Sequence, residues 1–338
     1  MPCGVISPRA TARSNNTPNG GFDSTLEELY FAVAAAAIRR GYHCLTFAGP
    51  GQGDALREQG LPFRPDWERV VTPMVDYALT RPEVDAARVA LMGWSYGGYF
   101  APRAAAFEPR IAALIAWDGL YDLLEPGLAT VPPEARSEMA RALAANPHAL
   151  DAPLREMMRA DLGIRWALTN GMYTFGVGSP GEYVAKLRDY NLQGVAEHIT
   201  CPTLVCEAEQ DHFFRGQPEQ LFAALTCPKT FMRFTTEEGA EEHCHAGAHA
   251  LFHERAFRLA RRSVRMNRPP VIACRRYVGA EAVSRPSARA VSRSATPDTS
   301  TTVTSAAAIT AGAVLPSASS TPTFAPRTRP APRRSRRA

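Results

Sequence analysis

Residues 89–98 have the pattern of a buried strand that turns sharply into a helix. The apolar residues 89–92 run into a glycine, and a helix rich in small residues is predicted over 96–107. The connection between them reads Gly93-Trp94-Ser95-Tyr96-Gly97. In such a connection the serine backbone is strained and its hydroxyl projects out of the sheet, as a nucleophile requires. Ser95 is therefore the first candidate nucleophile.

Strands and helices alternate along residues 20–264. Apolar runs predict strands, and helical spacing of apolar residues predicts helices between them. The predicted strands are 42–47, 88–93, 111–117, 203–207 and 229–234, and the predicted helices are 67–80, 96–107 and 246–261. This order is typical of an α/β fold with a mostly parallel sheet and helices on both faces.

Residues 121–199 interrupt the alternation. Helical patterns occur at 133–145 and 154–168, and no clear strand pattern accompanies them. An all-helical insertion between two strands of a parallel sheet is most simply a cap over the carboxyl edge of that sheet. We therefore predict a core made of residues 20–120 and 200–264, with residues 121–199 as a helical cap.

The two ends of the chain differ from its body. Residues 1–19 are predicted to be irregular, and residues 265–338, with few large apolar side chains, to be a disordered basic tail. The tail has 13 Arg against two acidic residues, a net charge of +11, so a chain of +5 leaves −6 for the rest. Since no aromatic platform accompanies the arginines, we predict no nucleic-acid partner.

Cysteine usage and hydropathy bear on the compartment. The seven cysteines are odd in number and show no CxxC spacing, which argues against a disulfide framework or a zinc site. No apolar run reaches the roughly 18–20 residues of a membrane span, and the N-terminus has no signal-peptide pattern. We expect a cytoplasmic protein without membrane association, metal or cofactor, and leave a homodimer open.

A nucleophilic serine needs a base, and the base needs an acid to orient it. In a strand–turn–helix setting of this kind the chain order is serine, acid, histidine. Asp211 follows the strand 203–207 and is the preferred acid, with Glu209 in reserve. The loop after the strand 229–234 offers two bases, His243 and His245, and position alone favours His243 only slightly.

Acyl transfer also requires backbone N–H groups that meet the negative charge on the carbonyl oxygen. The Tyr96 amide, just after the nucleophile, is one, and a glycine-rich loop after an early strand should supply the other. The loop 19–23 fits, with the Phe22 amide as the donor. Asp23 and Ser24 are interpreted as helix-capping residues, because Ser24-Thr25-Leu26-Glu27 reads as a capping box.

Five motifs in order point to a known group. They are Gly-Gly-Phe-Asp-Ser (20–24), Gly-Pro-Gly-Gln-Gly (49–53), Gly-Trp-Ser-Tyr-Gly-Gly-Tyr (93–99), Ala-Glu-Gln-Asp-His-Phe-Phe (208–214) and Glu-Gly-Ala-Glu-Glu-His-Cys (238–244). Over residues 20 to about 260 the chain resembles the α/β hydrolases related to dihydropseudooxynicotine hydrolase and to fungal polyketide-shortening hydrolases, whose bacterial relatives are often labelled acylaminoacyl-peptidase-like. The resemblance implies an α/β-hydrolase fold with Ser95 as nucleophile, Asp211 as acid and His243 as base.

The predicted function is that of a cofactor-free serine hydrolase. It would cleave an ester, an amide or a ketone-adjacent C–C bond of a small-molecule substrate through an acyl-enzyme. C–C cleavage needs an extra acid, for which Asp118 is a weak candidate, and the candidate apolar walls of the pocket are Trp94, Tyr121, Trp166 and Tyr173.

An alternative function follows from residues 1–19. Members of the group usually have a strand before the Gly-Gly-Phe-Asp loop, and these residues do not show one. The alternative is a truncated hydrolase-fold protein that is catalytically impaired and acts at most as a binding module.

Overall fold

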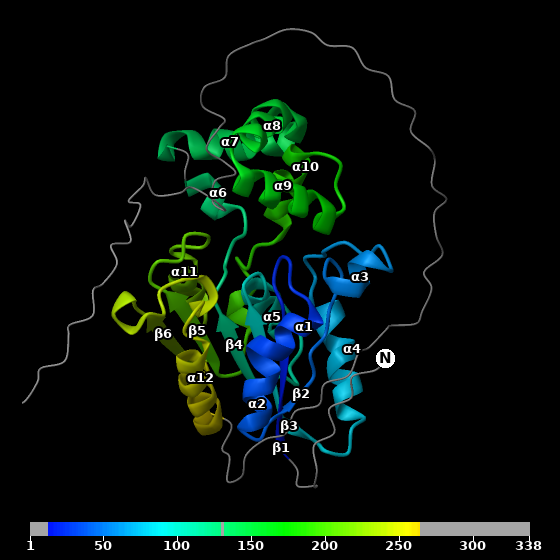
Figure 1. Ribbon diagram of the computed structural model, residues 1–338, viewed down its shortest axis with the longest axis vertical. Helices are drawn as coiled ribbons and strands as arrows, with labels where there is room; N and C mark the ends of the chain where they lie inside the picture. The colour runs from blue at the N-terminus through cyan, green and yellow to red at the C-terminus, as the bar shows by residue number, and fades with distance from the viewer. Residues whose placement is uncertain (1–12, 130–131, 264–338) are drawn as a thin grey trace, which may run out of the picture.

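In the computed structural model, residues 13–129 and 132–263 are described. They form a sheet of six strands in the order β2-β1-β3-β4-β5-β6 (Figure 1). All neighbouring strands are parallel. The strands are β1 (Arg13–Asn19), β2 (His43–Cys44), β3 (Val84–Trp94), β4 (Ala113–Trp117), β5 (Thr203–Ala208) and β6 (Lys229–Phe234). The predicted α/β fold is confirmed, whereas the predicted basic tail lies outside the described residues.

The carboxyl ends of parallel strands lie at one edge of the sheet. Trp94 at the end of β3 is paired with Trp117 at the end of β4, and β5 and β6 continue the same edge. The loops that follow these four strands therefore meet, although they are far apart in the sequence. This edge is where ligands bind in open α/β sheets.

β1 corrects the prediction of an irregular N-terminus, at least from residue 13. Its sequence, Arg-Ser-Asn-Asn-Thr-Pro-Asn, lacks the apolar run that predicts a buried strand. It is held by pairing with β3 on one side and β2 on the other, and Thr17 donates a hydrogen bond to the Ala90 carbonyl. Pro18, which has no N–H, is tolerated because β2 pairs only with residues 15 and 16.

The two faces of the sheet are apolar, and helices cover both. Side chains alternate across a strand, so Val89 and Leu91 of β3 lie in one core cluster, and Met92 and Trp94 in the other. The first cluster includes residues of α4 (Glu68–Leu79), α5 (Gly97–Ala105) and α11 (Gln217–Ala224). The second includes residues of α1 (Leu26–Leu29), the π-helical η1 (Tyr30–Ala34), α2 (Ala35–Arg39) and α12 (His249–Ser263).

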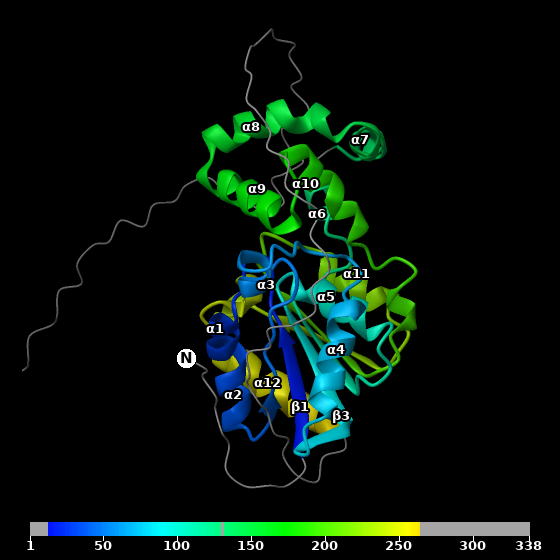
Figure 2. The same ribbon diagram turned by 90° about the vertical axis from the view of Figure 1, so that its right-hand side faces the viewer.

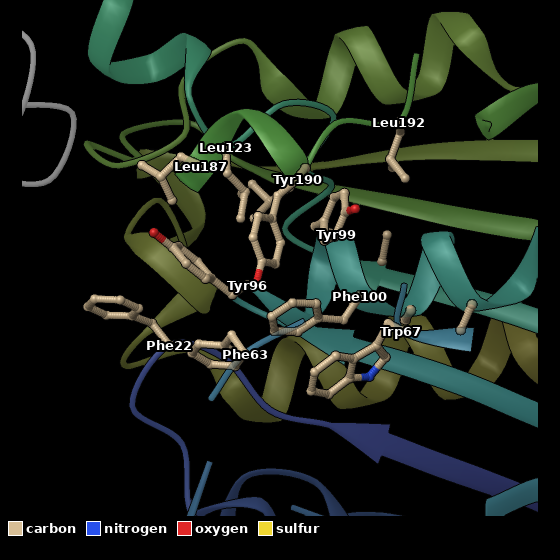
Figure 3. Packing of buried hydrophobic residues seen from close by; sticks show 14 of the residues in the cluster. Phe22, Phe63, Trp67, Tyr96, Tyr99, Phe100, Leu123, Leu187, Tyr190 and Leu192 are labelled. Atoms are coloured by element: carbon tan, nitrogen blue, oxygen red, sulfur yellow. The ribbon is translucent and has the colours of Figure 1, made fainter. Parts of the chain in front are cut away.

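An aromatic group anchors α4 and α5 to the first face. Trp67 and Phe100 are stacked with ring centroids 4.1 Å apart, and Phe63 packs beside both (Figure 3). The same cluster continues through Tyr99 and Tyr190 toward the residues of the helical segment. Figure 3 shows Phe22 and Tyr96 at its outer end.

The described part of residues 121–199 is helical and lies beyond the carboxyl edge of the sheet (Figures 1 and 2). Its α-helices are α6 (Glu125–Ala129), α7 (Pro133–Ala145), α8 (Asp151–Ala160), α9 (Leu162–Phe175) and α10 (Pro180–Lys186). The single helix predicted over 154–168 is two helices, because Asp161 leaves the helical conformation and caps α9 by accepting from the Ile164 amide. Below them lies the short helix α3 (Gly53–Arg57).

Short 3₁₀ segments complete the described chain. They are η2 (Pro147–Leu150), η3 (Leu187–Asp189), η4 (Ala196–His198), η5 (Thr236–Glu238) and η6 (His243–His245). Cys201, Cys206, Cys227 and Cys244 are free thiols. Among the described helices, none has the length and apolar character that a membrane crossing requires.

Candidate active site

Ser95 lies in the turn between β3 and α5, with a backbone φ of 57°. This left-handed conformation is strained for a residue with a side chain and is the hallmark of a nucleophile turn. The turn is tight: the Gly98 amide donates to the Ser95 carbonyl over 2.6 Å. The strand–turn–helix context that was predicted from the sequence is present.

The loops after β5 and β6 bring an acid and a histidine to Ser95. The Nε2 atom of His243 is 3.0 Å from the Ser95 Oγ, and its Nδ1 atom is 2.8 Å from Oδ2 of Asp211. The other carboxylate oxygen of Asp211 accepts from the Phe213 and Phe214 amides. Since these amides fix the carboxylate, they also fix the orientation of the imidazole.

Burial and neighbouring groups shift the pKa values of Asp211 and His243 in opposite directions. Burial alone would raise the pKa of Asp211, but the hydrogen bond and charge of His243, with the two backbone amides, lower it. Burial alone would lower the pKa of His243, but the charge of Asp118 and the hydrogen bond with Asp211 raise it to about 9. Asp211 is therefore the ionised partner of a strongly basic imidazole.

The glycine-rich loop 20–24 packs against Ser95. A β-carbon on Gly21 would be 2.6 Å from the Ser95 β-carbon, so only glycine fits there. Gln52, which is 2% exposed, donates through Nε2 to the carbonyls of Gly20 and Gly21. The Gly49–Gly53 turn thus holds this loop through a side chain that the sequence did not single out.

Ser24 does not cap the following helix as predicted. Its hydroxyl accepts from the Gly21 amide over 2.7 Å, which closes the loop. Thr25 is the capping residue, and it accepts from the Glu28 amide. Thr25 therefore holds the helix, while Ser24 shapes the loop that faces Ser95.

A cavity of about 260 Å³ opens above Ser95. Phe22, Tyr96 and His243 line it beside the serine, and α9 and α10 contribute Trp166 and Tyr183. The remaining lining residues are Asp23, Leu123, Leu124, Pro126, Gly127, Ala167, Leu168, Val184, Leu187, Phe213 and Phe214. The lining is mostly apolar and aromatic, with the few polar groups gathered at the serine, as is usual for small-molecule sites.

Three of the predicted pocket walls are not among the lining residues. Trp94 is buried against Trp117 on the other face of the sheet. Tyr121 packs against the core at the start of the helical segment. Tyr173 is 53% exposed on α9. Trp166 is the only one of the four predicted aromatic walls that lines the cavity, because of its position on the inner side of α9.

Asp118 lies after β4, where the sequence placed it, but it does not reach the cavity. It is 1% exposed and is not among the cavity-lining residues. Its Oδ2 is 3.8 Å from Nδ1 of His243, on the side away from Ser95. An acid that protonates a leaving group must reach the substrate, so the predicted role as the extra acid of C–C cleavage does not fit this position.

The reserve candidates are engaged in other contacts. Glu209 accepts from the Thr236 amide, and His245 is fully buried and stacked on Phe234.

Asp118, His243 and Cys244 place possible metal-ligand atoms within 4.8 Å of one another. However, both ring nitrogens of His243 already have partners, Ser95 and Asp211, which disfavours metal binding there.

Several lining residues could not be found from the sequence. Phe213 and Phe214 follow Asp211 in one of the five motifs, which was their only signal. The residues from the helical segment had no distinguishing pattern, because apolar residues of a helix facing a cavity look like those facing a core.

Comparisons with known proteins agree with this architecture. The family model described as "Alpha/beta hydrolase family" matches residues 19–262. The hydrolase acrC of Aspergillus aculeatus is 36% identical over 249 residues, which are 70% of this chain and 58% of that protein. The 20-hydroxy-prefusarin hydrolase FUS2 of Gibberella moniliformis is 34% identical over 249 residues, 70% of this chain and 59% of that protein. The chain thus spans somewhat over half the length of these relatives.

Solved structures share the fold. The 2,6-dihydroxy-pseudo-oxynicotine hydrolase aligns over 80% of this chain and 70% of its own, with a TM-score of 0.55 and 19% identity. The α/β hydrolase GrgF from a Penicillium species aligns over 76% of this chain and 92% of its own, with a TM-score of 0.52 and 20% identity. The resemblance inferred from the five sequence motifs is confirmed at the level of the family.

Proposed function

The chain belongs to the alpha/beta hydrolase family, and on that basis we propose that it is a serine hydrolase that acts through an acyl-enzyme. The observation that carries the proposal is the hydrogen-bonded series from Ser95 through His243 to Asp211. Ser95 and His243 line an apolar cavity large enough for part of a small molecule.

In the proposed reaction, the Ser95 Oγ attacks the substrate carbonyl carbon while its proton passes to Nε2 of His243. The imidazolium is stabilised by Asp211, which holds Nδ1–H. The tetrahedral intermediate then collapses: the bond to the leaving group breaks, and His243 delivers the proton to that group. Water, deprotonated by the same histidine, releases the acyl group and restores Ser95.

We assign the oxyanion site to the backbone amides of Phe22 and Tyr96. Tyr96 precedes the first turn of α5, where helix N–H groups have no partner within the helix. Phe22 follows Gly21, whose contact with Ser95 brings the loop next to the nucleophile. These positions support a two-amide site, in which each donor contributes about 10²–10³ to the rate.

The substrate class follows from the cavity lining. Aromatic and aliphatic side chains suit an apolar acyl group, and Tyr96 and Tyr183 add hydroxyls that lie 3.2 Å apart. The helical segment of residues 121–199 would act as a cap that encloses this group. We propose a small-molecule substrate, in keeping with a relative named as the hydrolase of 20-hydroxy-prefusarin.

The bond cleaved is proposed to be an ester, an amide or a C–C bond beside a ketone. A leaving carbanion would need a proton donor, and Asp23 is the carboxyl group that lines the cavity. Parallel assays of a p-nitrophenyl ester, an acyl-peptide and a 1,3-diketone would separate the three reactions. If Asp23→Asn abolishes diketone cleavage but leaves ester cleavage, the C–C reaction is the one for which the cavity is built.

The test of the serine mechanism is Ser95→Ala. We expect loss of ester turnover and loss of labelling by an organophosphonate, with the melting temperature retained. Labelling that persists in this variant would show that another residue is the nucleophile, and the proposal would be abandoned.

The alternative of an impaired binding module loses its main support. It depended on the lack of a strand before Gly20, and β1 ends at Asn19. A cytoplasmic location, a homodimer and the lack of a nucleic-acid partner stay predictions from the sequence.

A further inference from the structure

His243 faces two carboxylates rather than one. Asp211 forms the hydrogen bond to Nδ1 at 2.8 Å, and the Asp118 Oδ2 lies 3.8 Å from the same atom, about 1 Å farther. The two acids come from different strand ends, β5 and β4. The mechanism proposed above uses only Asp211.

Burial of the Asp118 carboxylate at this position costs free energy. Asp118 is 1% exposed, and neither of its carboxylate oxygens has a hydrogen-bond partner of normal geometry in the described part of the chain. The thiol and backbone amide of Cys244 are the polar groups beside it, and they lower its pKa less than burial raises it. Its backbone has a φ of 71°, and its carbonyl oxygen occupies the space where a β-carbon on Gly98 would lie. A buried carboxylate is normally compensated by a cation or by hydrogen bonds.

The nearest group that can supply a positive charge is the imidazole of His243 in its protonated form. Around His243, the other charged or titratable groups are Asp211, Asp23, Cys244 and His245. Burial raises the pKa of the Cys244 thiol well above its usual range and lowers that of His245 to about 3. Both are therefore neutral near pH 7, and the charges facing the imidazole are carboxylates.

We propose that Asp118 is a second positioning carboxylate for His243: it strengthens the imidazole as a base and becomes the partner of Nδ1–H when Asp211 is removed. The inference rests on the proposed function, because it concerns the same histidine. The field of Asp118 acts most strongly when the imidazole is charged, so it favours the state formed during proton transfer. Asp118 does not touch the substrate.

The pKa directions agree with this placement. Burial raises the pKa of Asp118 to about 6, against the opposing effect of His243, and the charge of Asp118 raises the pKa of His243 together with the hydrogen bond and charge of Asp211. The carboxylate and the imidazole therefore titrate together. Removing the Asp118 charge should lower the pKa of His243.

The first experiment measures that pKa directly. In Ser95→Ala protein, NMR titration of the His243 ring is compared with and without Asp118→Asn. Asparagine keeps the side-chain shape and tolerates a left-handed backbone, so the fold should be retained. We expect the pKa of His243 to fall by about one unit or more. An unchanged pKa would overturn the proposal, whether or not Ser95 is the nucleophile.

The matched control is Glu108→Gln. Glu108 is also buried, at 3% exposed, but it precedes β4 at the opposite end and pairs with Arg110. We expect this variant to leave the pKa of His243 unchanged. A shift equal to that of Asp118→Asn would mean that loss of any buried carboxylate has this effect, and would also overturn the proposal.

The second experiment tests whether Asp118 takes over as the partner of His243 Nδ1–H when Asp211 is removed. With a p-nitrophenyl ester, Asp118→Asn should move the acid limb of the kcat/KM profile to lower pH, in parallel with the NMR pKa. Asp211→Asn should keep at least about ten times the kcat of the Asp118→Asn/Asp211→Asn protein, since in the single variant one carboxylate still faces Nδ1. Equal kcat in the two proteins, with an unmoved acid limb, would make Asp118 a structural residue. Activity that survives Ser95→Ala would instead refute the proposed function.

Discussion

A β-carbon on Gly21 would lie 2.6 Å from the β-carbon of Ser95 and 2.9 Å from its hydroxyl oxygen. Protein atoms do not pack that closely, so Gly21→Ala must displace either the loop or the serine. In both cases the Phe22 amide and the Ser95 hydroxyl lose their alignment. We expect kcat to fall about 100-fold, as for loss of one oxyanion donor, when it is measured with a p-nitrophenyl ester.

Gly178→Ala is the control for this change. A β-carbon on Gly178 meets only the flexible carboxylate of Glu182, at 3.4 Å. This variant should keep the wild-type kcat. If Gly21→Ala also keeps it, the loop has room to move and does not carry an oxyanion donor.

Gln52 is expected to affect both stability and rate. Its amide group donates to the carbonyls of Gly20 and Gly21 and accepts from the Gly49 amide. Gln52→Leu leaves these buried groups unpaired, which should cost about 2–3 kcal/mol in the free energy of unfolding. We also expect lower kcat with little change in KM. Urea unfolding and ester kinetics measure the two effects.

Gln220→Leu provides the comparison for Gln52→Leu. Gln220 is half-buried on α11 and donates to Glu125, and neither residue lines the cavity. Its loss should lower stability slightly and leave kcat unchanged. A Gln52→Leu protein with normal kcat would show that the loop keeps its shape without the glutamine.

The sequence predicted the sheet well where strands are apolar. The runs at 111–117 and 203–207 correspond to β4 and β5, which are buried along their whole length and therefore mostly apolar. The run at 229–234 corresponds to the edge strand β6, which is exposed at Lys229, Thr230 and Arg233 and was recognised by its apolar residues 231, 232 and 234. β1 could not be predicted in this way, since its polar residues are held by pairing with β3. Tertiary pairing there outweighs local propensity.

The site residues around Ser95 also fall into those that the sequence could predict and those that it could not. Chain order predicted Asp211 and a histidine in the loop after residues 229–234, because parallel strands end at one edge and their loops must meet. The choice of His243 over His245 came from the resemblance to the known group. Trp94, Tyr121 and Tyr173 were predicted from residue type alone, and residue type does not say which way a side chain points. Asp118 was noted for its place after β4, but its distance from His243 depends on two loops that are far apart in the sequence.

Trp166 should contribute to substrate binding more than to chemistry. It lines the cavity from α9 and meets Phe22 edge to face, with ring centroids 5.8 Å apart. Removing an aromatic contact costs about 1 kcal/mol, so Trp166→Ala should raise KM roughly fivefold to tenfold for an ester with an apolar acyl group. kcat should change little, since Trp166 is not among the hydrogen-bonded residues at Ser95.

Tyr173→Ala is the matched variant on the same helix. Tyr173 is 53% exposed and Trp166 is 46% exposed, so the two aromatic residues are similarly accessible to solvent. Tyr173 does not line the cavity, and its loss should leave KM unchanged. Equal KM values for the two variants would place the acyl group elsewhere than beside α9.

The last prediction concerns the pH dependence of stability. Burial lowers the pKa of His245 to about 3, below its unfolded value near 6.5, so between these values the unfolded chain binds the extra proton. The free energy of unfolding is therefore fully kept above pH 6.5 and falls as the pH drops toward 3, by about 2 kcal/mol between pH 6.5 and 4.5. In His245→Phe, whose ring can still stack on Phe234, this contribution should vanish.

Urea unfolding at pH 6.5, 5.5 and 4.5 measures how steeply the free energy of unfolding changes with pH in the two proteins. Since buried His253 titrates in both proteins, only their difference reports on His245, and parallel slopes would show that His245 is protonated in the folded state.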